Sequence, residues 1–112
     1  MRIETHQLQD DTVIAVIGRL DSATAPEFEE QCSVVAAAAP RRVVLDCGRL
    51  EYLSSAGLRA LLCLGKALRE SGGELCLCDL RGLVAEVVSL SGFDSLFRVF
   101  DDLDSLEEAP EG

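Results

Sequence analysis

The sequence predicts an α/β fold: a single domain whose mixed, mostly parallel β-sheet of about four strands is covered by about four helices. Three observations carry this prediction. Short apolar runs rich in β-branched residues alternate with stretches of helical period, the helical stretches suit crossover connections, and no linker or internal repeat interrupts the pattern. This alternation implies right-handed crossovers and a largely parallel sheet, with the N-terminal strand antiparallel at an edge.

The 112 residues allow one compact domain with one core, so we expect residues 1–112 to form that domain and residues 109–112 to be a frayed tail. The expected elements are, in chain order, strands at 3–8 and 12–17, a helix from Thr24 to Pro40, a strand at 43–45, a helix from the serines at 54 and 55 to the residue before Ser71, a strand at 74–79, a helix at 83–90, an extended segment at 97–100 and a short acidic helix capped by Asp101 or Asp102.

Two local signals place the first helix. Thr24 and Glu27 have the spacing of a capping box, and Pro26 falls in the first turn, where its missing N–H costs little. The strand before it is expected to end at Gly18. In a parallel sheet the turns at 18–21 and 53–56 then lie at the same edge, so we expect them to be neighbours.

The chain is organised around residues 50–62, which read LEYLSSAGLRALL. Ser54 and Ser55 stand where a strongly apolar helix is predicted to begin. The first backbone N–H groups of a helix lack intrahelical partners and the helix dipole is positive there, so this position suits an anion or a modified serine.

Composition excludes several classes of function. A formal net charge of −10 disfavours direct nucleic-acid binding. The N-terminal residues lack the pattern of a signal peptide and the longest apolar helical stretch carries Arg59 and Lys66, so we expect a cytoplasmic protein with no membrane insertion. The five cysteines are interpreted as mostly buried and reduced, because Cys76 and Cys78 alternate on a strand instead of forming paired zinc knuckles; no metal or cofactor is expected.

Signatures of an enzyme are also missing. A hydrolase elbow needs glycine two residues before its nucleophile, but Leu53 occupies that position relative to Ser55. His6 is the only histidine available as a base. Gly72 and Gly73 are not followed by the Lys-Ser/Thr of a Walker loop. We therefore expect no catalytic activity.

Three ordered stretches resemble one family, the STAS domain of bacterial anti-sigma factor antagonists. GRLDSATAPEFEE at 18–30 is similar to its first loop and helix. VVLDCGRLEYLSSAGL at 43–58 is similar to the strand leading to its phosphorylatable serine, and LSGFDSLFRVFDD at 90–102 to its closing segment. The resemblance spans nearly the whole chain.

The resemblance implies that Ser55 is the phosphoacceptor. Ser54 replaces the aspartate that usually precedes this serine, and Ala56 replaces the hydroxyl residue that usually follows it. If that aspartate mainly caps the helix, Ser54 can do the same; if it orients the hydroxyl or binds the kinase, its loss weakens the assignment. The partner-binding residues implied are Asp21, Ser54, Ser55, Ala56, Gly57 and Arg59, with Arg19 interpreted as a solvated side chain.

Partner switching is the function that the resemblance implies. The unphosphorylated domain would bind an anti-sigma factor serine kinase and free a sigma factor or another client, phosphorylation at Ser55 would end binding, and a serine phosphatase would restore the hydroxyl. Arg59, one turn beyond Ser55, would partner the phosphate. The alternative is a non-phosphorylated STAS adaptor subunit of a lipid-transport ABC system.

Overall fold

A six-stranded mixed sheet forms the centre of the computed structural model, which describes residues 1–108. Its strand order is β1-β2-β3-β5-β6, and β4 pairs with β2 off this path. The elements are β1 (Arg2–Leu8), β2 (Asp11–Leu20), α1 (Ala25–Ala37), β3 (Arg42–Asp46), β4 (Leu50–Leu53), α2 (Ser55–Glu70), β5 (Glu74–Cys78), α3 (Gly82–Ser91), α4 (Phe93–Leu96), β6 (Arg98–Phe100) and the 3-10 helix η1 (Asp104–Glu108).

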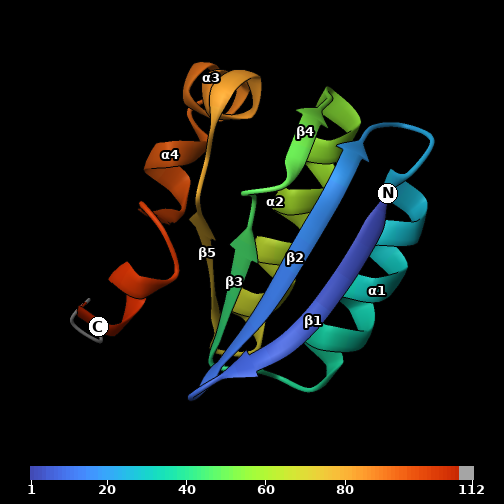
Figure 1. Cartoon of the computed structure of the whole chain (residues 1–112). Helices are drawn as coiled ribbons and strands as arrows, with labels where there is room; N and C mark the ends of the chain where they lie inside the picture. The colour runs from blue at the N-terminus through green and yellow to red at the C-terminus, as the bar shows by residue number, and fades with distance from the viewer. Residues whose placement is uncertain (109–112) are drawn as a thin grey trace.

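The topology confirms the predicted mostly parallel α/β sheet. β1 is antiparallel to β2, while the pairs β2–β3, β2–β4, β3–β5 and β5–β6 are parallel. Helices α1 and α2 cover one face (Figure 1), where Phe28, Leu61 and Leu68 pack on strand residues such as Val16 and Leu45 in the main core. Six residues of α2 are buried, more than in the other helices of the described chain.

The second face of the sheet has a much thinner cover. Val13, Val44, Cys76 and Cys78 form a separate buried cluster there with Leu106, which belongs to η1. Partly buried side chains from the neighbouring segments, Leu8, Phe100 and Leu103, pack around this cluster. Asp102 caps the segment, as its Oδ1 accepts hydrogen bonds from the backbone N–H and hydroxyl of Ser105.

The end of β2 and the presence of β4 differ from what the sequence predicts. β2 does not end at Gly18 but continues to Leu20, because a bulge at Gly18, whose φ is +101°, lets the strand change register and go on. Residues 50–53, for which no strand was predicted, pair with this extension. The two segments at 18–21 and 53–56 are therefore neighbours, as predicted, but through strand pairing.

The capping box proposed for the first helix is wrong. Thr24 is the N-cap, but its side chain makes no capping hydrogen bond; the hydroxyl donates to the carbonyl of Arg19 and accepts from the N–H of Asp21. The carboxylate of Asp21 organises this turn instead, because it accepts hydrogen bonds from the N–H groups of Ala23 and Thr24. The helix also ends at Ala37, earlier than Pro40, and Ala39 adopts φ +50°. Within residues 1–108, no helix is long and apolar enough to span a membrane.

Candidate functional site

Ser54 caps helix α2 as predicted. Its backbone is extended, with φ −93° and ψ 176°, and its Oγ accepts a hydrogen bond from the N–H of Gly57 at 3.3 Å. Its own N–H donates to the carbonyl of Leu20 at 3.0 Å, and its carbonyl accepts the first helical bond from Leu58. Ser54 therefore ties the start of the helix to the end of β2.

Ser55 is the first residue of α2 and is exposed. Ala56, next to it, is half-buried. Arg59, one turn further along the same helix, is also exposed. The first turn of α2 holds no acidic residue, so the positive end of the helix dipole is not offset within that turn. The arrangement presents a serine hydroxyl to solvent in a setting that tolerates added negative charge.

Gly57 lets the helix approach β2 closely. A Cβ at this position would lie 2.8 Å from the carbonyl oxygen of Leu20 and 2.7 Å from a methyl carbon of Leu53. These separations are shorter than van der Waals contact, so only glycine fits without a shift. The role of Gly57 is therefore to set the position of the two serines relative to the sheet.

Asp21 follows β2 directly and organises the turn into α1. Its Oδ1 accepts hydrogen bonds from the N–H of Ala23 at 3.0 Å and of Thr24 at 3.3 Å, and from the Thr24 hydroxyl. Desolvation raises the pKa of Asp21, but these hydrogen bonds and the charge of Arg19 outweigh it, so the pKa lies below its ordinary value. Since Ser54 bonds to Leu20, Asp21 and the two serines belong to one end of the fold.

Arg19 is exposed, as interpreted from the sequence, but it also contacts Tyr52, a residue that the sequence analysis did not single out. The two residues are paired in register between β2 and β4, and the Arg19 guanidinium carbon lies 4.2 Å from the centre of the Tyr52 ring. Arg19 Nε also lies 3.6 Å from Asp21 Oδ2. The signal that could have found Tyr52 is its identity as the only tyrosine, placed two residues before the serines.

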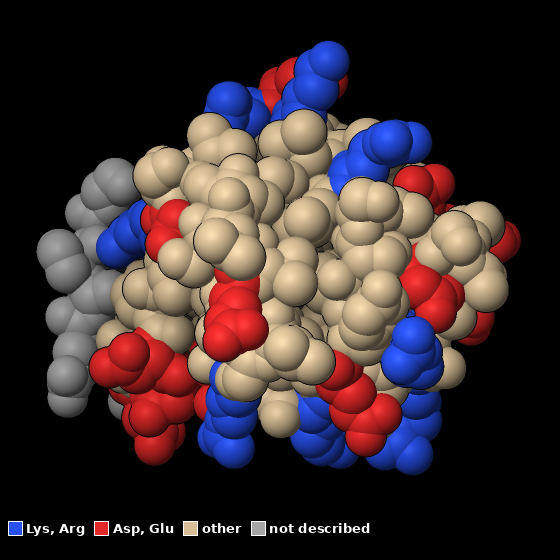
Figure 2. Space-filling view, turned by 90° about the horizontal axis from the view of Figure 1, so that it is seen from above, with Lys and Arg blue, Asp and Glu red and all other residues tan. Residues whose placement is uncertain are grey.

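Helix α3 extends this end of the molecule. It contacts β4, and its residues Leu83 and Leu90 are exposed, in contrast to Val84 and Val88 on its inner side. The view from above in Figure 2 shows a broad uncharged area with charged side chains mostly around it. An uncharged surface at the end of the fold where α2 begins suits the binding of another protein.

Comparison with known families decides what kind of domain this is. Residues 2–106 match the STAS domain. This chain belongs to the STAS domain family. The resemblance inferred from three sequence stretches is thereby confirmed, and the match covers every element up to the middle of η1.

Several relatives of this STAS domain are named anti-sigma factor antagonists. BtrV of Bordetella bronchiseptica, which its name assigns to the anti-sigma factor antagonists, is 41% identical over 99 residues, 88% of this chain and 85% of the relative. The anti-sigma-F factor antagonist RsfB of Mycobacterium tuberculosis is 29% identical over 81% of this chain and 74% of its own length. The crystal structure of an anti-sigma factor antagonist from Mycobacterium paratuberculosis superposes with a TM-score of 0.84 at 28% identity, covering 93% of this chain and 88% of that one.

The cysteines of this STAS domain are mainly packing residues. Cys32, Cys47, Cys76 and Cys78 are buried and only Cys63 is exposed. Burial raises the pKa of the Cys32, Cys76 and Cys78 thiols to about 12, and that of Cys47 further still. Among residues 1–108 no three His, Cys, Asp or Glu side chains are grouped so that they could hold a metal ion.

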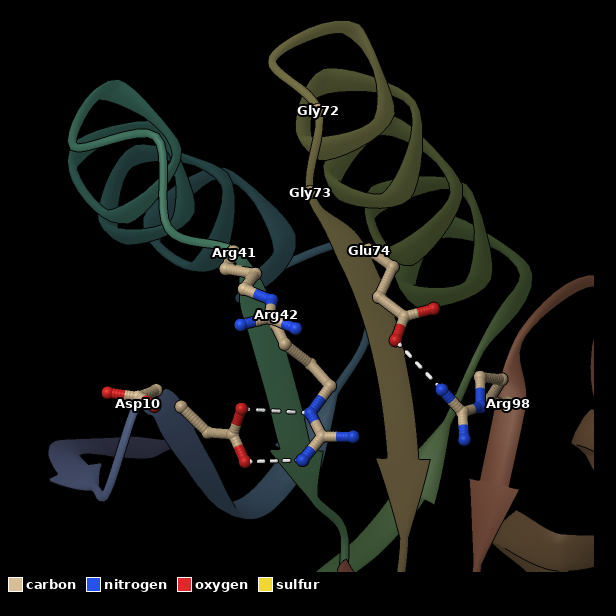
Figure 3. Close-up of a pocket in the computed structure, with 8 residues that line it drawn as sticks. Asp10, Arg41, Arg42, Gly72, Gly73, Glu74 and Arg98 are labelled. Atoms are coloured by element: carbon tan, nitrogen blue, oxygen red, sulfur yellow. Dashed lines mark hydrogen bonds and ion pairs between the residues drawn. The ribbon is translucent and has the colours of Figure 1, made fainter. Parts of the chain in front are cut away.

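A cavity of about 530 Å³ lies at the opposite end of the sheet (Figure 3). It opens where β3, β5 and β6 begin, and Asp10, Arg41, Gly72 and Gly73 contribute to its wall. Its charges are largely paired: Arg42 makes a bidentate pair with Asp11 at 2.9 and 2.6 Å, and Arg98 meets Glu74 at 3.1 Å. These pairs tie strands together, and the cavity contains no residue of the predicted site.

Proposed function

We propose that this STAS domain is an anti-sigma factor antagonist that works by partner switching. The unphosphorylated form binds an anti-sigma serine kinase, which releases a sigma factor or another client. The kinase transfers the γ-phosphoryl group of ATP to Oγ of Ser55, with loss of the hydroxyl proton and release of ADP, and the complex then dissociates. A serine phosphatase hydrolyses the phosphate ester and restores the binding form, so the domain is a substrate and has no catalysis of its own.

The observation that carries this proposal is that Ser55 is exposed at the first position of α2, at the same end of the fold as Asp21. The names of the relatives support the same general function. Ser54 supports it as well, because this residue provides the helix cap in place of the aspartate that is usual in the family.

Phosphorylation would change the partner's surface more than the domain itself. It adds about 1.5 to 2 negative charges. On this chain the dianion would stand at the positive end of α2 with Arg59 one turn away, whereas a docked partner would have to accommodate a bulky solvated group. A penalty of about 3 kcal/mol at the interface weakens binding more than a hundredfold, since each 1.4 kcal/mol is a factor of ten. We propose Asp21, Ser54, Ala56, Gly57 and Arg59 as the surrounding contact residues.

Kinase treatment tests the proposal. The chain is incubated with Mg-ATP and the anti-sigma serine kinase encoded in the same genome, and the products are mapped by mass spectrometry. We expect one phosphate, on Ser55, which Ser55→Ala abolishes and the matched control Ser22→Ala, an exposed serine in the Asp21 turn, retains. Ser55→Asp should fail to bind the kinase. An active kinase that leaves Ser55 unmodified would refute the switch.

The same preparation discriminates the adaptor alternative. An adaptor subunit of a lipid-transport ABC system would remain unmodified and would co-purify with a permease and a lipid-binding subunit. Binding of the kinase in the absence of ATP, followed by release on phosphorylation, would exclude that alternative.

A further inference from the structure

Two weak contacts hold the Arg19 side chain in place. Its guanidinium lies 4.2 Å from the centre of the Tyr52 ring, and its Nε lies 3.6 Å from Asp21 Oδ2, which is too long for a hydrogen bond. The Arg19 side chain is 60% exposed, so solvent screens both contacts. A stronger anion close by would therefore draw Arg19 away.

The Asp21 carboxylate would compete poorly with a phosphate for binding Arg19. Its Oδ1 already accepts hydrogen bonds from Ala23 and Thr24, and these fix the carboxylate in the turn. The other oxygen, Oδ2, lies 3.6 Å from Arg19 Nε, which is too long for a hydrogen bond, so this contact is not a hydrogen-bonded bidentate pair. A planar guanidinium binds a phosphate through two parallel hydrogen bonds, which is a stronger arrangement than either present contact.

Ser55 is within reach of Arg19. The strand register places Arg19 beside Tyr52, and the N–H of Ser54 bonds to the carbonyl of Leu20, the residue after Arg19. Neighbouring strands are about 4.8 Å apart and rise about 3.3 Å per residue, so the Cα atoms of Arg19 and Ser55 are separated by about 11 Å at most. An arginine and a phosphoserine side chain extended toward each other can bridge that separation.

We propose that Arg19 receives the phosphate on Ser55, leaving the Tyr52 ring when the serine is modified. The inference rests on the proposed function for the occurrence of the modification. It extends the proposed function, because the phosphate would rearrange the neighbouring surface as well as add charge. A partner that docks against Arg19 stacked on Tyr52 would find the ring uncovered and the guanidinium engaged.

The chain provides its own reporter for this movement. Tyr52 is the only tyrosine and there is no tryptophan, so one pair of tyrosine ring-proton signals reports on the stacking without ambiguity. Phosphoserine is incorporated at position 55 during translation, with an orthogonal phosphoserine tRNA and synthetase, so no kinase is needed. Failure of the kinase experiment would therefore count against the proposed function without affecting the proposed movement of Arg19.

NMR spectra of the serine and phosphoserine forms are then compared. We expect the Tyr52 ring protons of the phosphoserine form to move to the positions they have in Arg19→Gln, where no guanidinium lies over the ring. The Arg19 Nε–H signal should move downfield and exchange more slowly with water. In Arg19→Gln the phosphate should leave the Tyr52 signals unchanged.

Arg59→Gln is the matched control, because it removes an exposed arginine one turn from Ser55 without touching Tyr52. The Tyr52 response to phosphate should persist in this variant. The proposal is overturned if the Tyr52 and Arg19 signals of the two wild-type forms coincide. It is equally overturned if Arg59→Gln abolishes the Tyr52 response and Arg19→Gln preserves it.

Discussion

Replacing Gly57 by alanine tests how closely α2 must approach the sheet. The added methyl would lie 2.8 Å from the carbonyl oxygen of Leu20 and 2.7 Å from a methyl carbon of Leu53. That carbonyl cannot turn away, because it accepts the N–H of Ser54, so the start of the helix must move. Overpacking costs about 1–3 kcal/mol, and the higher helix propensity of alanine offsets at most about 1 kcal/mol.

We therefore expect Gly57→Ala to lower the free energy of unfolding by about 1–2 kcal/mol, which corresponds to a fall in Tm of about 5–10 °C. Urea denaturation followed by circular dichroism measures the loss. Ser55→Ala, an exposed change in the same turn, is the control and should stay within about 0.5 kcal/mol of the parent. A Gly57→Ala variant with the parent's stability and unchanged amide shifts at Leu20 and Ser54 would refute the close-approach argument.

Three further predictions address other contacts. Ser54→Ala should lose about 1 kcal/mol in urea denaturation, since the N–H of Gly57 loses its acceptor, while Ser54→Asp should retain the cap; equal stabilities would contradict the capping role. Arg42→Gln should lose about 2–4 kcal/mol because it strands the carboxylate of Asp11, whose side chain is only 15% exposed, and the double variant with Asp11→Asn should recover part of the loss in a double-mutant cycle. A thiol reagent at pH 8 should label Cys63 rapidly and the other cysteines only on unfolding, and rapid labelling in Cys63→Ser would show that a buried thiol is accessible.

Local signals explain why the start of α2 was predictable. Two serines before an apolar stretch of helical period are themselves the chemistry of an N-cap, and Ser54 makes that bond with Gly57. The three buried strands were likewise predictable, because short, nearly continuous apolar runs are typical of strands covered on both faces. These features depend on residues only a few positions apart in the chain, so they can be predicted from local sequence.

Strand β4 could not be predicted in the same way. Its burial does not alternate, since Leu50 and Leu53 are buried while Glu51 and Tyr52 between them are exposed. Its partner also exists only because β2 continues past the bulge at Gly18. The contact of Arg19 with Tyr52 depends on that long-range register, so it was invisible before the pairing was known.

The capping box failed for a related reason. Thr24 and Glu27 have suitable spacing, but spacing does not say which acceptor the Thr24 hydroxyl prefers. The hydroxyl bonds to the carbonyl of Arg19 at 2.9 Å, and Asp21 accepts the backbone N–H groups of the turn. Competition among nearby polar groups is resolved by the path of the chain leaving β2.

The thin cover on the second face of the sheet limits how far this chain can be shortened without exposing apolar side chains. Leu103 and Leu106 shield Val13, Val44 and Cys76 from water, although they come from the last described segment. A truncation before residue 103 would leave these apolar side chains uncovered, and such a form should self-associate. Affinity tags and fusion partners are therefore best joined beyond Leu106, where the buried cluster is already closed.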